Sequence, residues 1–213
     1  MNLTVLQLLK ICPSLNLDRA TKVVNALNEV CPLYGINTPD ILHEFLANAA
    51  HESQNFTRLE ENLNYSAARL MVVWPHRFPD MGTAQKYSGN PKALAEKVYG
   101  GRKDLGNDTP LDGWLFSGGG IFQLTGRRNY TLFLTYYNKR FGAKHTLSEM
   151  AALIKSDWYY AVHSACWFFA VSKNLIPLAI SDNMKELSKR INGGFIGMDD
   201  RMKLYERAKK YIV

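Results

Sequence analysis

Three glutamates that lie close together in the chain, Glu52, Glu60 and Glu61, have the residue type that acid-base hydrolysis requires. Two carboxyl groups split a glycosidic bond when one protonates the leaving oxygen and the other activates water. When the two carboxyl groups lie about 6.5 to 9.5 Å apart, the water fits between them, and hydrolysis inverts the configuration at the anomeric carbon. On an unbroken helix, Glu61 lies about 13 Å along the axis from Glu52 and on the opposite face. A catalytic pair therefore requires a helix that ends between the two.

The helix that carries Glu52 is predicted to run from Pro39 to Glu52. Thr38 is suited to cap it, Pro39 suits the first helical position, and Asp40 complements the positive end of the helix dipole. Three apolar side chains share a face with Glu52: at 100° per residue, Ile41 and Phe45 lie about 20° from it on either side and Ala49 about 60° away. Burial and the negative helix end both favour a protonated carboxyl group, so Glu52 is expected to act as a general acid. An exposed or ion-paired glutamate at a helix end fits the same residues.

The segment after Glu52, from Ser53 to Thr57, is a weak helix former and is predicted to end the helix. The chain can then fold back, so that the carboxylates flank a cleft.

The segment from Tyr99 to Arg128 holds eight of the 15 glycines. A long irregular stretch inside a compact domain is usually functional when it is ordered. Its aromatic residues, Trp114, Phe116 and Phe122, argue against disorder. We therefore expect a functional loop region here.

Apolar residues at helical spacing predict helices through most of the remaining chain. The predicted ranges are Thr4 to Lys10, Leu17 to Tyr34, Ser66 to Val73, Pro91 to Tyr99, Tyr130 to Phe141, Ser148 to Ser156, Trp158 to Asn174, Ile180 to Ile191 and Arg201 to Tyr211. Few segments alternate with a period of two residues, so a mainly α fold with at most a short β-hairpin is expected. The length of 213 residues favours a single catalytic domain over 1–213, without a separate binding module.

The net charge of +7 favours an anionic partner such as nucleic acid, an acidic membrane surface or an acidic cell-wall polymer. No run of about 18 apolar residues occurs, so no membrane-spanning helix is expected. The first residues lack the basic region and the cleavage site of a secretory signal, which predicts synthesis in the cytoplasm.

The three cysteines, Cys12, Cys31 and Cys166, lack the spacing of a zinc or redox site. We expect free structural thiols, with one disulfide as the alternative. No HExxH motif or clustered carboxylate loop is present, so neither a metal nor a cofactor is expected.

A series of motifs runs from about residue 40 to residue 206. It comprises His51-Glu52-Ser53 to Glu61-Asn62-Leu63-Asn64-Tyr65-Ser66-Ala67, then Trp74-Pro75-His76-Arg77-Phe78, then Gly106-Asn107-Asp108 to Asp112-Gly113-Trp114, then the glycine-rich Gly118 to Tyr130, and finally Ile191-Asn192-Gly193-Gly194 with Arg201 and Tyr205. Each motif alone is weak. Their joint order and spacing resemble family-19 glycoside hydrolases, the chitinase-like enzymes, and are closest to the bacterial and phage endolysin branch. The resemblance implies a lysozyme-like, α-rich globule of two lobes with a central cleft.

By this resemblance, Glu52 corresponds to the general acid of the family, and Glu61, nine residues later, corresponds to its general base. Glu60 is the alternative candidate for the general base. Thr125 is implied to orient the attacking water through its hydroxyl, a role that a short side chain suits. The residues alone also fit Thr125 as a helix cap ahead of Tyr130.

Three amides, Gln123, Asn129 and Asn192, are implied to bind sugar hydroxyl or acetamido groups, since an amide donates and accepts at once. Asn192 also fits a plain turn residue before two glycines. Arg201 is implied to support the catalytic carboxylates, and an exposed partner of a nearby aspartate, Asp199 or Asp200, is its alternative.

Two positions depart from the family pattern. Many relatives carry Arg where this chain has Gly119, and several chitinases carry an acidic residue where it has Ile196. These changes alter the charged residues expected around the catalytic pair. The substrate specificity of the chitinases therefore does not follow for this chain from the resemblance.

The leading expectation is an endolysin-type muramidase that cleaves the β-1,4 bond between N-acetylmuramic acid and N-acetylglucosamine in peptidoglycan with inversion. It is expected to act as a monomer on the cell wall, after release through a membrane lesion made by a holin-type partner. A chitinase acting on β-1,4-linked N-acetylglucosamine is the alternative. A non-catalytic glycan- or nucleic-acid-binding domain is a third hypothesis, although no nucleic-acid partner is expected.

Overall fold

The computed structural model describes residues 2–213 and divides them into two compact units. The terminal unit comprises residues 2–59, 120–123 and 153–213, and the central unit comprises residues 60–119 and 124–152. That they make one catalytic domain with a central cleft stays a prediction.

Within residues 2–213 the chain forms thirteen α-helices, and its β-structure is limited to two isolated bridges, Glu60 with Gly119 and Gly119 with Leu124. The terminal unit contains α1 (Val5–Ile11), α2 (Leu17–Val30), the 3-10 helix η1 (Cys31–Tyr34), α3 (Pro39–Glu52), α10 (Trp158–Cys166), the π-helix η3 (Trp167–Ser172), α11 (Ile176–Ile180), α12 (Met184–Asn192) and α13 (Met198–Tyr211). The central unit contains α4 (Ala67–Val73), α5 (Met81–Gln85), α6 (Pro91–Tyr99), the 3-10 helix η2 (Lys103–Leu105), α7 (Asp112–Leu115) and α8 (Arg127–Phe141), and α9 (Leu147–Ser156) begins in it. The prediction of a mainly α fold is confirmed.

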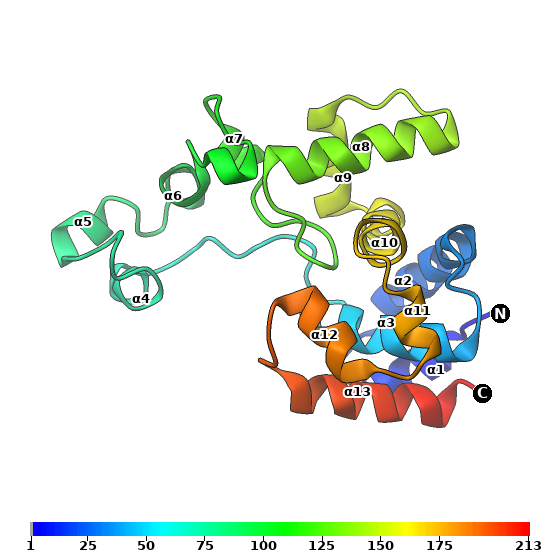
Figure 1. The fold of residues 1–213 in the computed structure, drawn as a ribbon. Coiled ribbons are helices and arrows are strands. Elements are labelled where there is room, and N and C mark those ends of the chain that lie inside the picture. The colour runs from blue at the N-terminus through cyan, green and yellow to red at the C-terminus, as the bar shows by residue number, and fades with distance from the viewer. Residues whose placement is uncertain (1) are drawn as a thin grey trace. The chain divides into compact units, whose positions relative to one another are not determined.

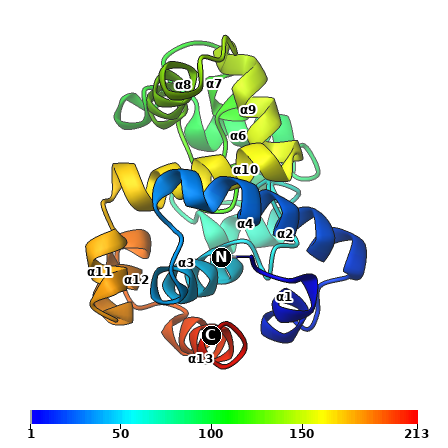
Figure 2. The same ribbon diagram turned by 90° about the vertical axis from the view of Figure 1, so that its right-hand side faces the viewer.

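The helix α3 lies at the centre of the terminal unit, where α13 packs along it (Figure 1). Figure 2 shows the same pair from the side, with α2 and α10 also side by side. Ten consecutive residues of α3, from Ile41 to Ala50, are buried. A helix buried on all sides must find partners for its polar residues inside the protein. The predicted bounds of α3 and the N-cap position of Thr38 are confirmed, but the Thr38 side chain makes no capping hydrogen bond.

The end of α3 is a sharp turn. Gln54, Asn55 and Phe56 all adopt left-handed backbone conformations, with φ of 53°, 58° and 55°. Such a run of non-glycine residues is strained and persists only where its surroundings hold it. The Ser53 hydroxyl accepts from the Phe56 amide at 3.0 Å, and the buried Phe56 ring packs edge-on against Trp158. The predicted helix end after Glu52 is confirmed.

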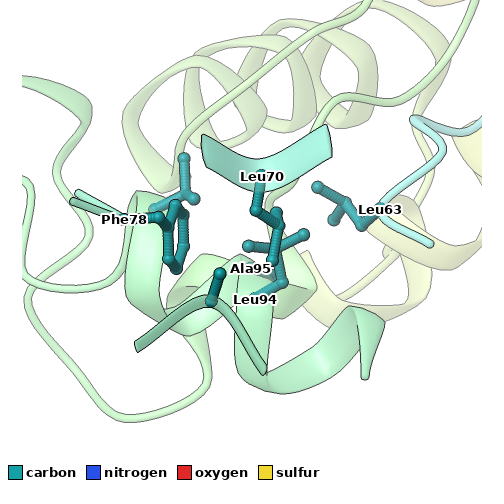
Figure 3. Close-up of a cluster of buried hydrophobic side chains, with 7 residues drawn as sticks. Leu63, Leu70, Phe78, Leu94 and Ala95 are labelled. Carbon is teal, nitrogen blue, oxygen red and sulfur yellow. The ribbon is translucent and has the colours of Figure 1, made fainter. Parts of the chain in front are cut away.

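The core of the central unit is built by residues 63–98. Figure 3 shows Leu63, Leu70, Phe78, Leu94 and Ala95 meeting in one buried cluster. Tyr65, Trp74, Tyr99 and Trp114 pack around it. Truncating a buried leucine in such a cluster to alanine costs about 2–5 kcal/mol. Tyr99, the last residue of α6, packs against this cluster, which thereby helps to hold its side chain in place.

Several predicted helices differ from the observed ones. The predicted helix from Ile180 to Ile191 is confirmed from Met184 onward as α12, but its start is wrong, because the chain breaks between α11 and α12. Asp182 is left-handed there, with φ of 54°, and the Asn183 side chain caps α12 by accepting from the Glu186 amide. The predictions for Leu17 to Tyr34 and Trp158 to Asn174 each merge two elements, since a 3-10 and a π-helix follow α2 and α10. The short α5, α7 and η2 were not predicted.

All three cysteines are free and buried, which confirms the prediction of free thiols, and the Cys31 and Cys166 sulfurs lie 3.7 Å apart. Among the helices of residues 2–213, none has the length and apolar character needed to cross a membrane.

Candidate active site

Glu52 is the last residue of α3, and its side chain is 22% exposed. Its carboxylate accepts a hydrogen bond from Arg201 Nη2 and forms an ion pair with this guanidinium. Arg201 lies in the first turn of α13 and is only 1% exposed. The alternative of Arg201 as an exposed partner of Asp199 or Asp200 is therefore wrong. The protonation state expected for Glu52 stays a prediction.

A second residue of α3, Asn48, holds Arg201 from the other side. Its Oδ1 atom accepts from Arg201 Nη1 at 2.7 Å and from the Ser188 hydroxyl at 3.1 Å. Asn48 lies one helical turn before Glu52, so both side chains meet the same guanidinium. Sequence reasoning missed Asn48, although an amide on the helix face that carries Ile41 and Phe45 is a signal for a buried polar contact.

The loop after α12 is tied to the end of α3. His51 Nδ1 lies 2.7 Å from the Asp200 carboxylate. Gly197 packs so tightly on the His51 ring that a Cβ there would lie 2.3 Å from it. Asn192, the last residue of α12, is exposed and donates through Nδ2 to the Ile196 carbonyl at 3.3 Å. This hydrogen bond links the end of α12 to the loop that precedes α13.

Glu61 belongs to the central unit, and two donors hold its carboxylate. The Tyr99 hydroxyl lies 2.8 Å from Oε1 and 3.0 Å from Oε2, and the Gly118 amide donates to Oε2 at 3.3 Å. Burial and the charge of Glu61 raise the pKa of Tyr99 well above its usual range, so the hydroxyl keeps its proton at neutral pH. Glu61 is half-buried, whereas the neighbouring Glu60 is exposed.

The glycine-rich segment makes close approaches that side chains would prevent. Gly120 has a φ of +74°, and a Cβ on it would lie 2.8 Å from the Ser164 hydroxyl. Gln123 is also left-handed, with φ of 49°, and donates through Nε2 to the Gly120 carbonyl at 3.0 Å. Strained conformations of this kind cluster at functional sites. The segment is thus a tight, ordered loop.

Thr125 and Asn129 lie together at the start of α8. Asn129 Nδ2 donates to the Thr125 carbonyl at 2.7 Å. Gly126, not Thr125, occupies the capping position of α8, so the alternative of Thr125 as the helix cap is wrong.

An ion pair between α7 and α8 supports this region. Arg127 donates to the fully buried Asp112 through Nε at 2.8 Å, and Asn107 Oδ1 accepts from the Arg127 amide at 2.8 Å. Burial pushes the pKa of Asp112 upward, but hydrogen bonds from Arg127 and Thr109 outweigh it and bring that pKa down to about 2. The long irregular stretch predicted to be functional is therefore a structured one.

The predicted site residues thus form two groups. The terminal unit brings Glu52 and Arg201 into direct contact, and it also contains Gln123 and Asn192. The central unit contains Glu61 and the contacting pair Thr125 and Asn129. Sequence reasoning missed Tyr99 and Asn48, the side chains that hold Glu61 and Arg201.

No protein-family model matches the chain. Chitinase C from Streptomyces griseus HUT6037 has a similar fold, with a TM-score of 0.62 and 15% sequence identity, over 98% of this chain and 75% of that one. A variant of chitinase C gives the same values. A glycosyl hydrolase family 19 domain-containing protein of Haemophilus influenzae strain Rd is 33% identical over 162 residues, which is 76% of this chain and 74% of that protein. With this identity over most of both sequences, the chain belongs to glycosyl hydrolase family 19 and is a chitinase-like glycoside hydrolase.

Proposed function

We propose that this glycoside hydrolase is an endolysin-type muramidase that cleaves the β-1,4 bond between N-acetylmuramic acid and N-acetylglucosamine in bacterial peptidoglycan. Glu52 protonates the leaving oxygen, and Glu61 together with Thr125 activates the water that attacks the sugar from the opposite face. The reaction needs water and no cofactor. Action as a monomer, after release with the help of a holin-type partner, belongs to the same proposal.

The observation that carries the proposal is that Glu52 and Glu61 each have a partner suited to orienting them. Arg201 is buried against Glu52, and Tyr99 with the Gly118 amide holds Glu61. Groups held in one orientation are what acid-base catalysis requires, because misplacement costs rate steeply. The exposure of Glu60 favours Glu61 as the base.

The proposed sugar contacts come from Gln123, Asn129 and Asn192. Asn129 and Asn192 each donate one hydrogen bond to a main-chain carbonyl. An amide has a second donor hydrogen and a carbonyl acceptor, so each retains capacity for a sugar hydroxyl or acetamido group.

Peptidoglycan is favoured over chitin by charge and by the endolysin-like motifs. The net charge of +7 suits an anionic wall polymer, whereas chitin is neutral. Chitin hydrolysis is the second candidate, which the fold similarity to chitinase C favours.

The test compares wild type with Glu52→Gln on two substrates, permeabilised bacteria followed by turbidity and N-acetylglucosamine oligomers followed by product release. We expect wild type to lyse cells and Glu52→Gln to bind walls while losing at least about a hundredfold in rate. Rapid turnover of the oligomers without lysis would establish the chitinase instead. Lysis by Glu52→Gln at the wild-type rate would overturn the assignment of the acid, and wall binding without hydrolysis of either substrate would indicate a binding domain.

A further inference from the structure

The polar cluster behind Glu52 is more extensive than one ion pair. Asn48 is fully buried on α3, and both the carbonyl oxygen and the amino group of its side chain form hydrogen bonds. Oδ1 accepts from Arg201 and Ser188, while Nδ2 donates to the Glu44 carbonyl at 2.9 Å. Because the donor side meets a carbonyl, the acceptor side must face Arg201. The orientation of the amide is therefore defined by its surroundings.

Arg201 is a buried cation, and a buried cation needs both hydrogen-bond acceptors and a countercharge. Nη1 donates to Asn48 and Nη2 donates to Glu52, so two acceptors one turn apart on α3 fix the plane of the guanidinium. Among residues 2–213, Glu52 is the carboxylate that pairs with Arg201. The other acceptor is neutral.

Because Asn48 is neutral, it does not offset the positive charge of Arg201. With an amide as the second acceptor, the full charge of Arg201 acts on Glu52. A carboxylate in place of Asn48 would share that charge and would add its own repulsion to Glu52.

We propose that Asn48 is a positioning residue for Glu52, which fixes the buried Arg201 through a neutral acceptor and so leaves its charge to Glu52 alone. This inference rests on the proposed function, in which Glu52 is the general acid. Asn48 does not touch the substrate in this scheme and acts through Arg201.

The test uses Asn48→Asp and Asn48→Ala, with pH profiles of kcat/KM on whichever substrate the wild type cleaves. The high-pH limb of that profile reports loss of the proton from the acid. In Asn48→Asp this limb should move upward by about one pH unit, because a new negative charge opposes ionisation of Glu52. In Asn48→Ala, kcat should fall about tenfold to a hundredfold with KM changed by less than about threefold, because the guanidinium loses one of its two anchors.

The control variant is Asn28→Asp, which adds the same charge on α2, where Asn28 bonds to Leu3. It should leave the high-pH limb unchanged. The other titratable groups of the cluster, Glu44 and the pair of His51 with Asp200, are present in wild type and in every variant. Circular dichroism and thermal melting establish that each variant is folded.

Three results would overturn the proposal: an unchanged high-pH limb in folded Asn48→Asp, a wild-type kcat in folded Asn48→Ala, or failure of both variants to fold, which would assign Asn48 to stability. Glu52→Gln in the same assay separates this inference from the proposed function. If Glu52→Gln remains active, the function assignment fails. If it is inactive while Asn48→Asp keeps the wild-type profile, the inference alone fails.

Discussion

Glu52 and Glu61 have the same side-chain chemistry but different neighbours. Glu52 contacts a charged group, the buried guanidinium of Arg201, whereas Glu61 contacts neutral donors, the Tyr99 hydroxyl and the Gly118 amide. Two carboxyl groups in different environments can take different roles in one reaction, which is how glycosidases separate acid from base. Mutation of these neighbours should therefore change activity while both glutamates stay in place.

Tyr99→Phe removes the hydroxyl that bonds both oxygens of Glu61 and keeps the ring that packs on the central core. We expect kcat/KM to fall about tenfold, as for a lost hydrogen bond to a charged group. The low-pH limb of the profile should move upward, because the ionised base loses a donor that favours it. Tyr87→Phe, in the same aromatic cluster, is the matched control and should keep the wild-type profile. If Tyr99→Phe and wild type have the same pH profile of kcat/KM, Tyr99 does not position Glu61 for catalysis.

Among the helices, α3 was predicted from Pro39 to Glu52 and is found there, because its signals are local. Proline at the first position, an apolar run and a weak helix former after Glu52 all lie within the segment. The break between α11 and α12 was missed, although Asn183, which caps α12, is a local signal for it, and distant contacts also hold the break. Asp182 adopts its left-handed conformation where the Tyr205 hydroxyl of α13 donates to it and Lys209 lies 3.6 Å away. Contacts of this kind cannot be read from the residues around the break.

The burial of α3 also traps a carboxyl group that the proposed reaction does not use. Both oxygens of Glu44 are buried without a hydrogen-bond partner in the described part of the chain. Burial, helped by the charge of Asp182 and opposed by Lys209, raises the pKa of Glu44 to about 8. Its ordinary value is 4.5, so between these values the folded protein holds a proton that the unfolded chain has lost. The stability contributed by Glu44 is therefore complete below pH 4.5 and is lost as the pH rises toward 8.

Glu44→Gln should remove this pH dependence. We expect the variant to gain stability over wild type between pH 5 and pH 8, by on the order of 2 kcal/mol in the free energy of unfolding. Urea unfolding at the two pH values measures the difference, with the exposed Glu206→Gln as a control that should follow wild type. Parallel pH dependence in wild type and Glu44→Gln would contradict the buried, protonated Glu44.

Taken as a whole, the chain has a fold and a family that the order of its motifs could predict, since composition, helical periodicity and the spacing of Glu52 and Glu61 are all properties of the sequence. The resemblance implied Arg201 as a support of the catalytic carboxylates, but Tyr99 and Asn48 could not be predicted in the same way. Tyr99 reaches Glu61 across 38 positions, and Arg201 reaches Asn48 across 153. These contacts arise only when the helices pack. The roles of the site residues rest on the resemblance and on these contacts together.

The stereochemistry of the product tests the pair most directly. If Glu52 protonates the leaving oxygen while Glu61 activates water, a β-1,4 bond is opened with inversion, and the new reducing end first appears as the α-anomer. Proton NMR of the earliest product, recorded before mutarotation and with Glu52→Gln as the inactive control, measures this configuration. We expect the α-anomer on N-acetylmuramic acid, and a β-anomer formed first would contradict the roles of Glu52 and Glu61.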